Sequence, residues 1–262
     1  MAKKKPLILV SNDDGITSRG IRTLVELMTQ LGEVVVVAPN SPQSGMGHAI
    51  TVANTLRLDP SIAFEGGPVG GITAYECSGT PADCVKLAKH HVLKDRKPDL
   101  VVSGINHGSN SSVSVLYSGT MSAAIEAAIE GLPAIGFSLC DYSHEADFSH
   151  THEWVKKIAN QVLQHGLPAG VALNVNIPAK AAGEIEGIKI CRQANASWQE
   201  KFDTRKDPYG RRYFWMTGRF VNHDQGEDTD EWALAHHHVS IVPCVFDLTA
   251  HHALAALNAW GL

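Results

Sequence analysis

The chain has 262 residues, of which 44% are hydrophobic and 19% are charged, and its formal net charge is −5. This composition is enough for a sizeable buried core, and the charges do not form long like-charge runs, which argues against a disordered chain. A protein that binds nucleic-acid polymers usually carries a basic surplus, so the mildly acidic balance argues against that class as well.

The cysteines and the apolar runs indicate where the protein works. The five cysteines are widely spaced and form no C-x-x-C motif, which is typical of reduced thiols rather than of disulfides or a zinc site. The basic N-terminus precedes an apolar run of only residues 7–10, whereas a signal peptide needs roughly 7–15 apolar residues there. No run approaches the about 20 apolar residues of a transmembrane helix. We therefore expect a cytoplasmic protein that does not contact a membrane.

The N-terminal segment predicts a β-loop-α-β unit. Residues 7–11 are typical of a short buried strand, and it ends at the turn-forming sequence Asn12-Asp13-Asp14-Gly15. Apolar side chains recur at helical spacing over residues 21–31, and Gly32 marks the end of that helix. Residues 34–38 form the second strand. Units of this kind place their strands parallel in one sheet.

The middle of the chain continues this alternation. Thr80 and Pro81 predict the start of a helix that runs to about residue 93. The remaining helices are expected at residues 121–130 and 154–163, and the strands at residues 50–52, 72–75, 100–103, 134–139 and 171–177. Residues 104–110 are rich in glycine and asparagine, so we expect an irregular loop there.

After about Gly183 the alternation ends. Further strands are expected at residues 184–192, 209–219 and 239–242, and a solvated acidic loop at residues 224–231. Aromatic side chains gather in residues 198–220 around the turn sequence Pro208-Tyr209-Gly210, which predicts a hairpin. The sequence thus predicts a doubly wound α/β domain with a mostly parallel sheet over residues 1–183. A β-rich C-terminal extension is expected over residues 184–262.

Polar loops follow the predicted strands, at the edge where open parallel sheets bind ligands. The adjacent carboxylates of Asp13 and Asp14 repel each other unless a positive charge lies beside them. The alternative is that one carboxylate caps the next helix and the other is solvated. Because the other loops add the oxygen donors Ser44, Asn106 and Asn110, the set favours Mg²⁺ or Mn²⁺ over zinc or copper.

The sequence Ser118-Gly119-Thr120 opens a predicted helix with hydroxyls and free backbone N–H groups. Helix N-termini of this kind bind phosphate, and an ordinary helix cap by Ser118 or Thr120 uses the same donors. His48 is a candidate general acid or a structural histidine. The histidine runs at residues 236–238 and 251–252 are expected in surface or interface roles.

Five motifs occur in a fixed order between residues 8 and 126. They are ILVSNDDG at residues 8–15, VAP at residues 37–39 leading to SGMGH at residues 44–48, GTPADCV at residues 79–85, SGINHGSN at residues 103–110, and YSGT at residues 117–120 followed by Ala123, Ala124 and Glu126. Together they resemble the SurE family (survival protein E), the divalent-metal-dependent 5′/3′-nucleotidases. Beyond residue 183 the resemblance is looser and rests on Arg192-Gln193 and residues 213–216.

The resemblance implies a Rossmann-like core and a homodimer or homotetramer, held together by a hairpin and a C-terminal tail that reach a partner subunit. It implies one divalent cation per subunit, Mg²⁺ or Mn²⁺, held by Asp13, Asp14, Ser44 and Asn106. The two aspartates are the expected catalytic residues. The residues expected around the phosphate are Asn12, Gly45, Asn106, Asn110, Ser118, Gly119 and Thr120. The substrate implied is a nucleoside 5′-monophosphate, with 3′-monophosphates as a second class.

Two other functions remain open at this point. One is a short-chain exopolyphosphatase, because some members of the family degrade short polyphosphate. The other is a nucleotide-binding module without catalysis. The pair Asp13 and Asp14 argues against the latter, because two unneutralised carboxylates would repel a phosphate. Asp13 is the candidate to activate the attacking water, and direct attack by an aspartate to form an aspartyl-phosphate is the alternative.

Overall fold

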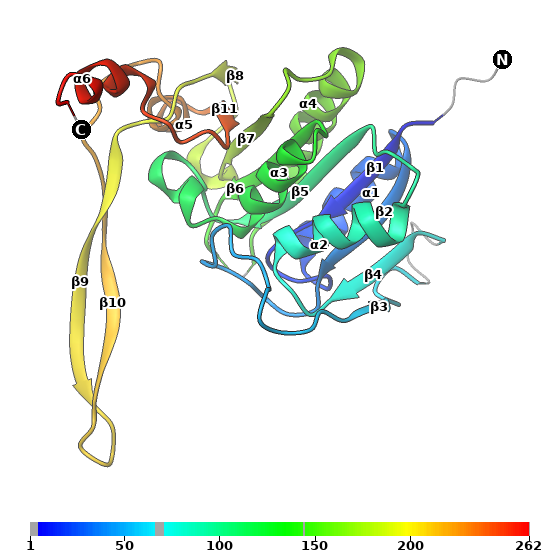
Figure 1. Cartoon of the computed structure of the whole chain (residues 1–262), viewed down its shortest axis with the longest axis horizontal. Helices are drawn as coiled ribbons and strands as arrows, with labels where there is room; N and C mark the ends of the chain where they lie inside the picture. The colour runs from blue at the N-terminus through cyan, green and yellow to red at the C-terminus, as the bar shows by residue number, and fades with distance from the viewer. Residues whose placement is uncertain (1–4, 66–70, 144, 262) are drawn as a thin grey trace.

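A computed structural model describes residues 5–65, 71–143 and 145–261 of the chain. Its centre is a nine-stranded sheet, shown in Figure 1. In spatial order the strands are β3 (Leu58–Pro60), β4 (Thr73–Cys77), β2 (Glu33–Pro39), β1 (Leu7–Ser11), β5 (Leu100–His107), β6 (Ala134–Cys140), β7 (Val171–Pro178), β11 (His238–Val245) and β8 (Gly187–Ile190). The six strands from β4 to β7 are parallel to one another, whereas β3 and β11 pair antiparallel with their inner neighbours. The predicted α/β fold with a mostly parallel sheet is confirmed.

Helices cover both faces of the sheet, as the alternation of side chains in β1 requires. Ile8 and Val10 belong to one buried cluster and Leu7 and Leu9 to another, because successive side chains of a strand point to opposite faces. The first cluster includes residues of α1 (Arg19–Thr29) and α4 (His152–His165). The second includes residues of α2 (Pro81–Leu87), of the π-helical turn Ala88–Leu93 and of α3 (Gly119–Ile129). Short 3₁₀ turns lie at Ser112–Leu116, Ser149–Thr151, Lys180–Ala182 and His251–Ala253.

The order of the strands creates a switch point between β1 and β5. From β1 the chain proceeds outward through β2 and β4, and from β5 it proceeds the opposite way through β6 and β7. Connections that leave in opposite directions open a crevice at the carboxyl ends of the two central strands. The turn that carries Asp13 and the end of β5 that carries Asn106 lie at that crevice.

Several predicted elements differ from the structure. Residues 50–52 do not form a strand, and the short antiparallel strand β3 lies at Leu58–Pro60 instead. Strand β5 continues to His107 through the segment predicted as a loop, because Asn106 and His107 still pair with β6 after a register shift. The end of the predicted acidic loop begins α5 (Asp230–Ala235), which is capped by the side chain of Thr229. The sequence also gave no expectation of α6 (Leu254–Asn258).

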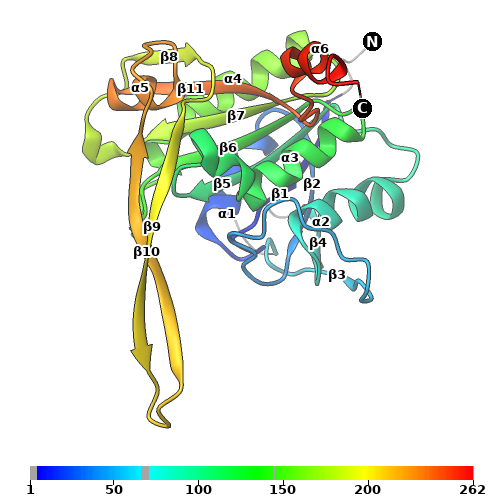
Figure 2. The same ribbon diagram turned by 60° about the vertical axis from the view of Figure 1, so that its left-hand side comes forward.

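The predicted hairpin is confirmed and forms a long arm. Strands β9 (Ala196–Lys206) and β10 (Arg212–Asn222) pair with each other along their whole length, as a sheet separate from the central one. The arm extends away from the body of the molecule in both Figure 1 and Figure 2. Large apolar side chains on it are exposed, among them Phe214 and Trp215.

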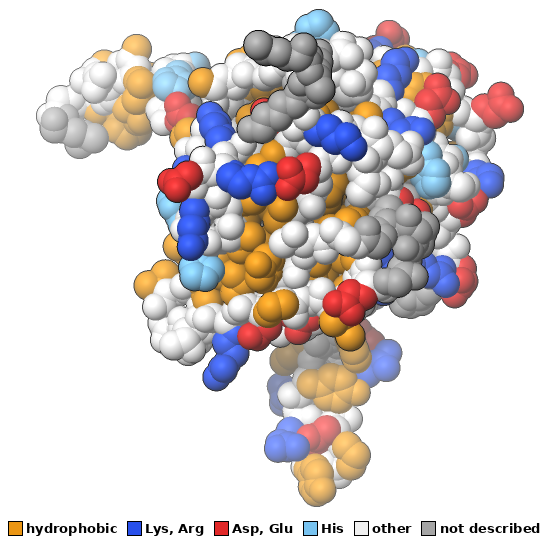
Figure 3. All heavy atoms as spheres, turned by 90° about the vertical axis from the view of Figure 1, so that its right-hand side faces the viewer, with side chains coloured by type: hydrophobic (Ala, Val, Ile, Leu, Met, Phe, Trp, Pro, Cys, Tyr) orange, Lys and Arg blue, Asp and Glu red, His pale blue; other side chains and the backbone are white. Residues whose placement is uncertain are grey.

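On the face shown in Figure 3, neither acidic nor basic side chains predominate. The two kinds are intermingled around a central hydrophobic area. Within residues 5–65, 71–143 and 145–261, no helix is long and apolar enough to cross a membrane. Strands β11 and β8, which come from the part of the chain after residue 183, extend the central sheet beyond β7.

Candidate active site at the carboxyl ends of β1 and β5

The turn after β1 is held by the side chain of Asn12. This buried amide donates hydrogen bonds to the carbonyl of Gly15 at 2.9 Å and to Oγ of Ser18 at 3.0 Å. Both acceptors lie at or before the start of α1, so the amide fixes the turn against the helix. Asn12 thereby places Asp13 and Asp14 at the crevice between β1 and β5. A direct contact of Asn12 with phosphate stays a prediction.

Asp13 is buried against the N-terminus of α3. Its Oδ1 accepts a hydrogen bond from the hydroxyl of Thr120 at 2.5 Å. A Cβ atom built on Gly119 would lie 2.6 Å from Cβ of Asp13, so only glycine allows this close approach. The structure therefore brings the predicted phosphate-binding turn into direct contact with a predicted metal ligand.

Ser118 and the first backbone N–H groups of α3 also lie at the crevice. Ser118 is the N-cap of α3, and its Oγ accepts a hydrogen bond from the backbone N–H of Met121 at 3.0 Å. The capping role predicted for Ser118 is thus observed. Since its oxygen is the acceptor in that bond, the hydroxyl proton remains able to bind an anion. The first N–H groups of a helix have no partner within the helix, which suits a phosphate at this position.

Asp14 is less buried than Asp13 and faces open space. It lines a cavity of about 210 Å³ together with Arg19, His107 and Phe148. Burial raises the pKa of Asp14, and the nearby His107 offsets only part of this effect. Burial also raises the pKa of Asp13 to about 6, and the charge of Asp14 adds to the shift. Both carboxylates are therefore placed where a cation would stabilise their charged form.

The loop that carries Ser44 lies beside the turn after β1 and the segment before α3. The backbone N–H of Gln43 donates to the carbonyl of Asp13 at 2.7 Å, and that of Gly47 donates to the carbonyl of Tyr117 at 3.1 Å. Residues 43–47 thus bridge the turn after β1 and the segment before α3. Ser44 and Gly45 are exposed within this bridge. They directly follow Gln43, whose backbone N–H is bonded to Asp13.

Asn106, near the end of β5, and Asn110, in the loop after it, have different roles. The side-chain nitrogen of Asn106 donates to the carbonyl of Gly108 at 2.8 Å, which turns its amide oxygen away from Gly108. The side-chain nitrogen of Asn110 donates instead to Oγ of Ser138 on β6 at 2.9 Å, and its backbone N–H donates to Asn176 on β7. Asn106 is therefore available as an oxygen donor, whereas Asn110 ties the loop to β6 and β7. Phosphate binding by Asn110 stays a prediction.

The sequence model of the family "Survival protein SurE" matches residues 8–200. The chain belongs to the SurE family. A relative from Cytophaga hutchinsonii, named 5′-nucleotidase SurE, is 73% identical over 97% of this chain and 96% of its own length. A second, from Christiangramia forsetii and with the same name, is 63% identical over 100% of this chain and 99% of its own.

A solved structure agrees with this assignment. The crystal structure of the SurE protein from Aquifex aeolicus superposes with a TM-score of 0.82 at 36% sequence identity, covering 98% of this chain and 100% of that one. The predicted resemblance to the SurE family, and with it the Rossmann-like fold, is confirmed.

One cluster in this SurE chain was not predicted from the sequence. Glu126, which is buried in α3, accepts hydrogen bonds from Nε2 of His48 at 2.8 Å and from Nζ of Lys86 at 2.6 Å. Burial would raise the pKa of Glu126, but these two hydrogen bonds outweigh it and hold the pKa below its usual value. His48 thus anchors the Ser44 loop to α3, which agrees with the structural interpretation of this histidine. Only the contact with Glu126, distant in sequence, reveals that role.

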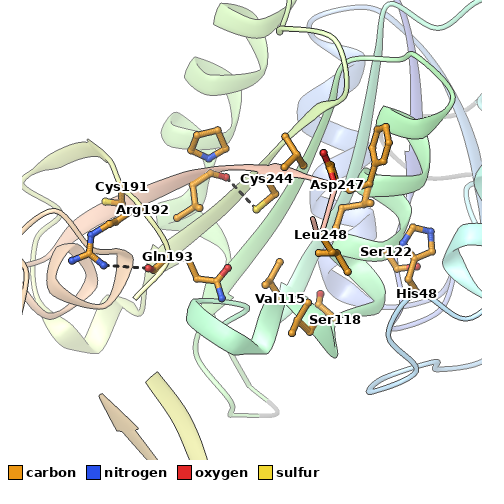
Figure 4. A pocket seen from close by; sticks show the side chains of 16 residues that line it. His48, Val115, Ser118, Ser122, Cys191, Arg192, Gln193, Cys244, Asp247 and Leu248 are labelled. Carbon is orange, nitrogen blue, oxygen red and sulfur yellow. Dashed lines mark hydrogen bonds between the residues drawn. The ribbon is translucent and has the colours of Figure 1, made fainter. Parts of the chain in front are cut away.

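His48 also borders the larger cavity shown in Figure 4. This cavity measures about 510 Å³ and is lined by Ser118 and Ser122 of the α3 segment and by the C-terminal residues Asp247 and Leu248. It includes Ser118, the N-cap of α3, and extends along α3 as far as Ile125.

Proposed function

We propose that this SurE-family chain is a phosphatase that hydrolyses nucleoside 5′-monophosphates, and also 3′-monophosphates, to nucleoside and phosphate with the help of a divalent cation. The observation that carries the proposal is the contact between the buried Asp13 and the helix N-terminus at Gly119 and Thr120. A proposed cation ligand thus lies against the helix N-terminus that is proposed to bind phosphate, and a cation site beside an anion site suits a phosphomonoester. The name 5′-nucleotidase SurE of the two close relatives supports the same substrate class.

The residues at the crevice fit one Mg²⁺ or Mn²⁺ ion per subunit. Asp13, Asp14, Ser44 and Asn106 would hold it, and all four offer oxygen donors, which these ions prefer. The raised pKa values of both aspartates support the fit, because a cation would supply the positive charge that these carboxylates need. When bound, such a cation polarises a phosphoryl oxygen and makes water a better nucleophile at neutral pH.

The chain itself supplies the remaining parts of the chemistry. The backbone N–H groups of Gly119 and Thr120 and the hydroxyl of Ser118 bind the phosphate and stabilise the charge that develops on it. Asp13 accepts the proton of the attacking water, while the hydroxyl of Thr120 holds its carboxylate in place. Direct attack by an aspartate on phosphorus is the second route that this arrangement allows.

We propose that the arm makes this protein a homodimer or homotetramer. A two-stranded hairpin is marginally stable alone in water and needs a surface to pack on. Phe202, Phe214 and Trp215 are each about 60% exposed on the arm, and aromatic side chains are favoured in interface cores. A cytoplasmic location remains a prediction from the sequence.

Hydrolysis assays test the proposed reaction. We expect release of phosphate from AMP to stop after chelation of divalent ions and to return when Mg²⁺ or Mn²⁺ is added. Full activity after exhaustive chelation would contradict the metal proposal. Tripolyphosphate serves as the competing substrate, and a kcat/KM for tripolyphosphate above that for every nucleotide would favour the exopolyphosphatase alternative. Binding of AMP without any turnover would favour the non-catalytic module.

A further inference from the structure

A second cavity lies along the same edge of the sheet as the aspartates. It measures about 390 Å³ and is lined by Ser109, Ser111, Cys140, Tyr142, Trp198 and Glu231, among others. Cys140 is the last residue of β6, and the loop after β7 also borders the cavity. The cavity therefore opens at the carboxyl ends of the strands, beside the loop that follows Asn106 and His107 at the end of β5, where an open α/β sheet binds its ligand.

Tyr142 is the unusual member of this lining. A Cβ atom on Gly108 would lie 2.5 Å from Cε1 of the tyrosine ring, so the ring rests directly on the backbone at this glycine. The phenol oxygen accepts a hydrogen bond from the backbone N–H of Ser109 at 3.2 Å. The residue nevertheless keeps 69% of its surface exposed. The ring is thus held at two points while much of its surface faces solvent.

The ring is linked directly to the proposed cation site. The carbonyl of Gly108 accepts the hydrogen bond from the side chain of Asn106, so one glycine contacts both the tyrosine and a proposed metal ligand. Trp198, which also lines the cavity, packs edge to face with Phe220 at 5.5 Å between ring centroids. Glu231 adds a carboxylate whose Oε1 accepts a hydrogen bond from Ser111.

Two other cavities border the proposed site. The cavity of about 510 Å³ includes Ser118 at the N-cap of α3, continues along α3 to Ile125, and is also lined by the C-terminal residues 242–248. The cavity at Asp14 measures about 210 Å³, below the roughly 300–1,000 Å³ that ligand pockets usually span. The cavity at Tyr142 has a suitable size, an aromatic surface and hydrogen-bond acceptors, and its lining residues Ser109 and Ser111 flank Asn110 in the chain.

We propose that Tyr142 is the stacking platform for the nucleobase of the substrate, and that the cavity between Tyr142 and Trp198 holds the nucleoside. This inference rests on the proposed phosphatase function and names the part of the substrate that the site recognises. The serine hydroxyls and Glu231 on the walls hydrogen-bond polar groups of the nucleoside. Every nucleobase has a flat face that can stack, so the site accepts several bases and disfavours sugar phosphates that lack a base.

Two substrates and two variants test this inference. AMP and ribose 5-phosphate share the phosphate and the ribose, and only AMP carries a base. Stacking on an aromatic side chain contributes about 1–3 kcal/mol per base, so Tyr142→Ala should lower kcat/KM for AMP by roughly 5- to 150-fold, mainly through KM. The value for ribose 5-phosphate should change less than about twofold. Tyr142→Phe keeps the ring and loses only the hydroxyl, so it should retain the preference for AMP.

The possible results separate the two proposals. If neither substrate is hydrolysed in the presence of Mn²⁺ by the parent chain, the phosphatase function itself is wrong. If both are hydrolysed but Tyr142→Ala changes them equally, or changes neither, the platform assignment is wrong. A loss in Tyr142→Phe as large as in Tyr142→Ala would also overturn it, because the hydroxyl would then act by holding the loop at Ser109. Circular dichroism and thermal unfolding establish that both variants are folded.

Discussion

The substitution Gly119→Ala tests the contact that joins the proposed cation and phosphate sites. The new methyl group would lie 2.6 Å from Cβ and 3.0 Å from Oδ2 of Asp13, whereas ordinary contacts begin at 3.4 Å. Asp13 or the N-terminus of α3 must therefore move by about 0.8 Å, because repulsion rises steeply at shorter distances. The carboxylate is also bonded to Thr120, so the shift cannot be confined to one side chain.

The expected magnitudes follow from this displacement. Metal sites tolerate deviations of about 0.2 Å in ligand distance, and loss of the groups that orient a ligand lowers metal affinity about 10- to 100-fold. We expect a weakening of Mn²⁺ binding in that range, measured by isothermal titration calorimetry, and a comparable loss of AMP turnover. Overpacking in a buried site costs about 1–3 kcal/mol, which corresponds to a fall in Tm of roughly 2–12 °C for a chain of this size.

A matched control distinguishes this effect from a general effect of glycine replacement. Gly187 lies in β8, where the nearest atom to a new Cβ would be 3.9 Å away on His238. Gly187→Ala should therefore keep the parental Mn²⁺ affinity, turnover and Tm. If Gly119→Ala behaves like this control, the close approach of α3 does not position Asp13, and the reasoning that connects the two sites is refuted.

Three further predictions address Asp14, the arm and Glu126. Asp14→Asn keeps the shape and removes a charge, so Mn²⁺ affinity should fall and AMP turnover should drop by orders of magnitude in a folded protein; near-parental turnover would place Asp14 outside the site. Replacing residues 203–213 of the arm with a short Gly/Ser loop should lower the mass seen by light scattering and leave Mn²⁺ binding in place; an unchanged mass would mean that the arm packs on its own subunit. Lys86→Met removes a hydrogen-bond partner of Glu126, whose pKa in the folded chain lies below its usual value. The ionised carboxylate therefore stabilises the fold at a pH above the ordinary glutamate pKa. This stabilisation is lost as the pH falls through the lower pKa of the folded chain. The difference in Tm between the parent and Lys86→Met should thus shrink between about pH 7 and about pH 4, and a constant difference would contradict this assignment.

The sequence predicted those parts of the fold whose cause is local. The buried strand at residues 7–11 and the helix after Thr80 follow from apolar periodicity and capping, and both are present. The predicted end of β5 was wrong. The glycine and asparagine content of residues 104–110 indicates a loop, whereas pairing with β6 extends the strand. The start of α5 was missed because the acidic residues hide a cap by Thr229. Partners distant in sequence decide such cases.

The candidate site shows the same division between local and long-range causes. Asp13, Asp14, Ser44 and Asn106 were assigned from motifs, and backbone hydrogen bonds place the first three on adjoining turns. The contact of Asp13 with Thr120 spans 107 positions in the chain, so no spacing rule reveals it. Tyr142 lies in none of the motifs, and its proposed role depends on its position over Gly108. Motifs therefore identify the chemistry, while the fold is needed to find the groups that arrange it.

A comparison of two buried carboxylates in this chain supports the proposed position of the cation at Asp13. Glu126 and Asp13 are 3% and 4% exposed, so burial disfavours the charged form of each. The chain gives Glu126 a hydrogen bond from the cationic Lys86 and another from His48, and the pKa of Glu126 lies below its usual value. Asp13 has the hydroxyl of Thr120 and the negative charge of Asp14, and its pKa rises to about 6. A phosphate at α3 would add further negative charge beside Asp13, so its binding and that of a divalent cation must reinforce each other.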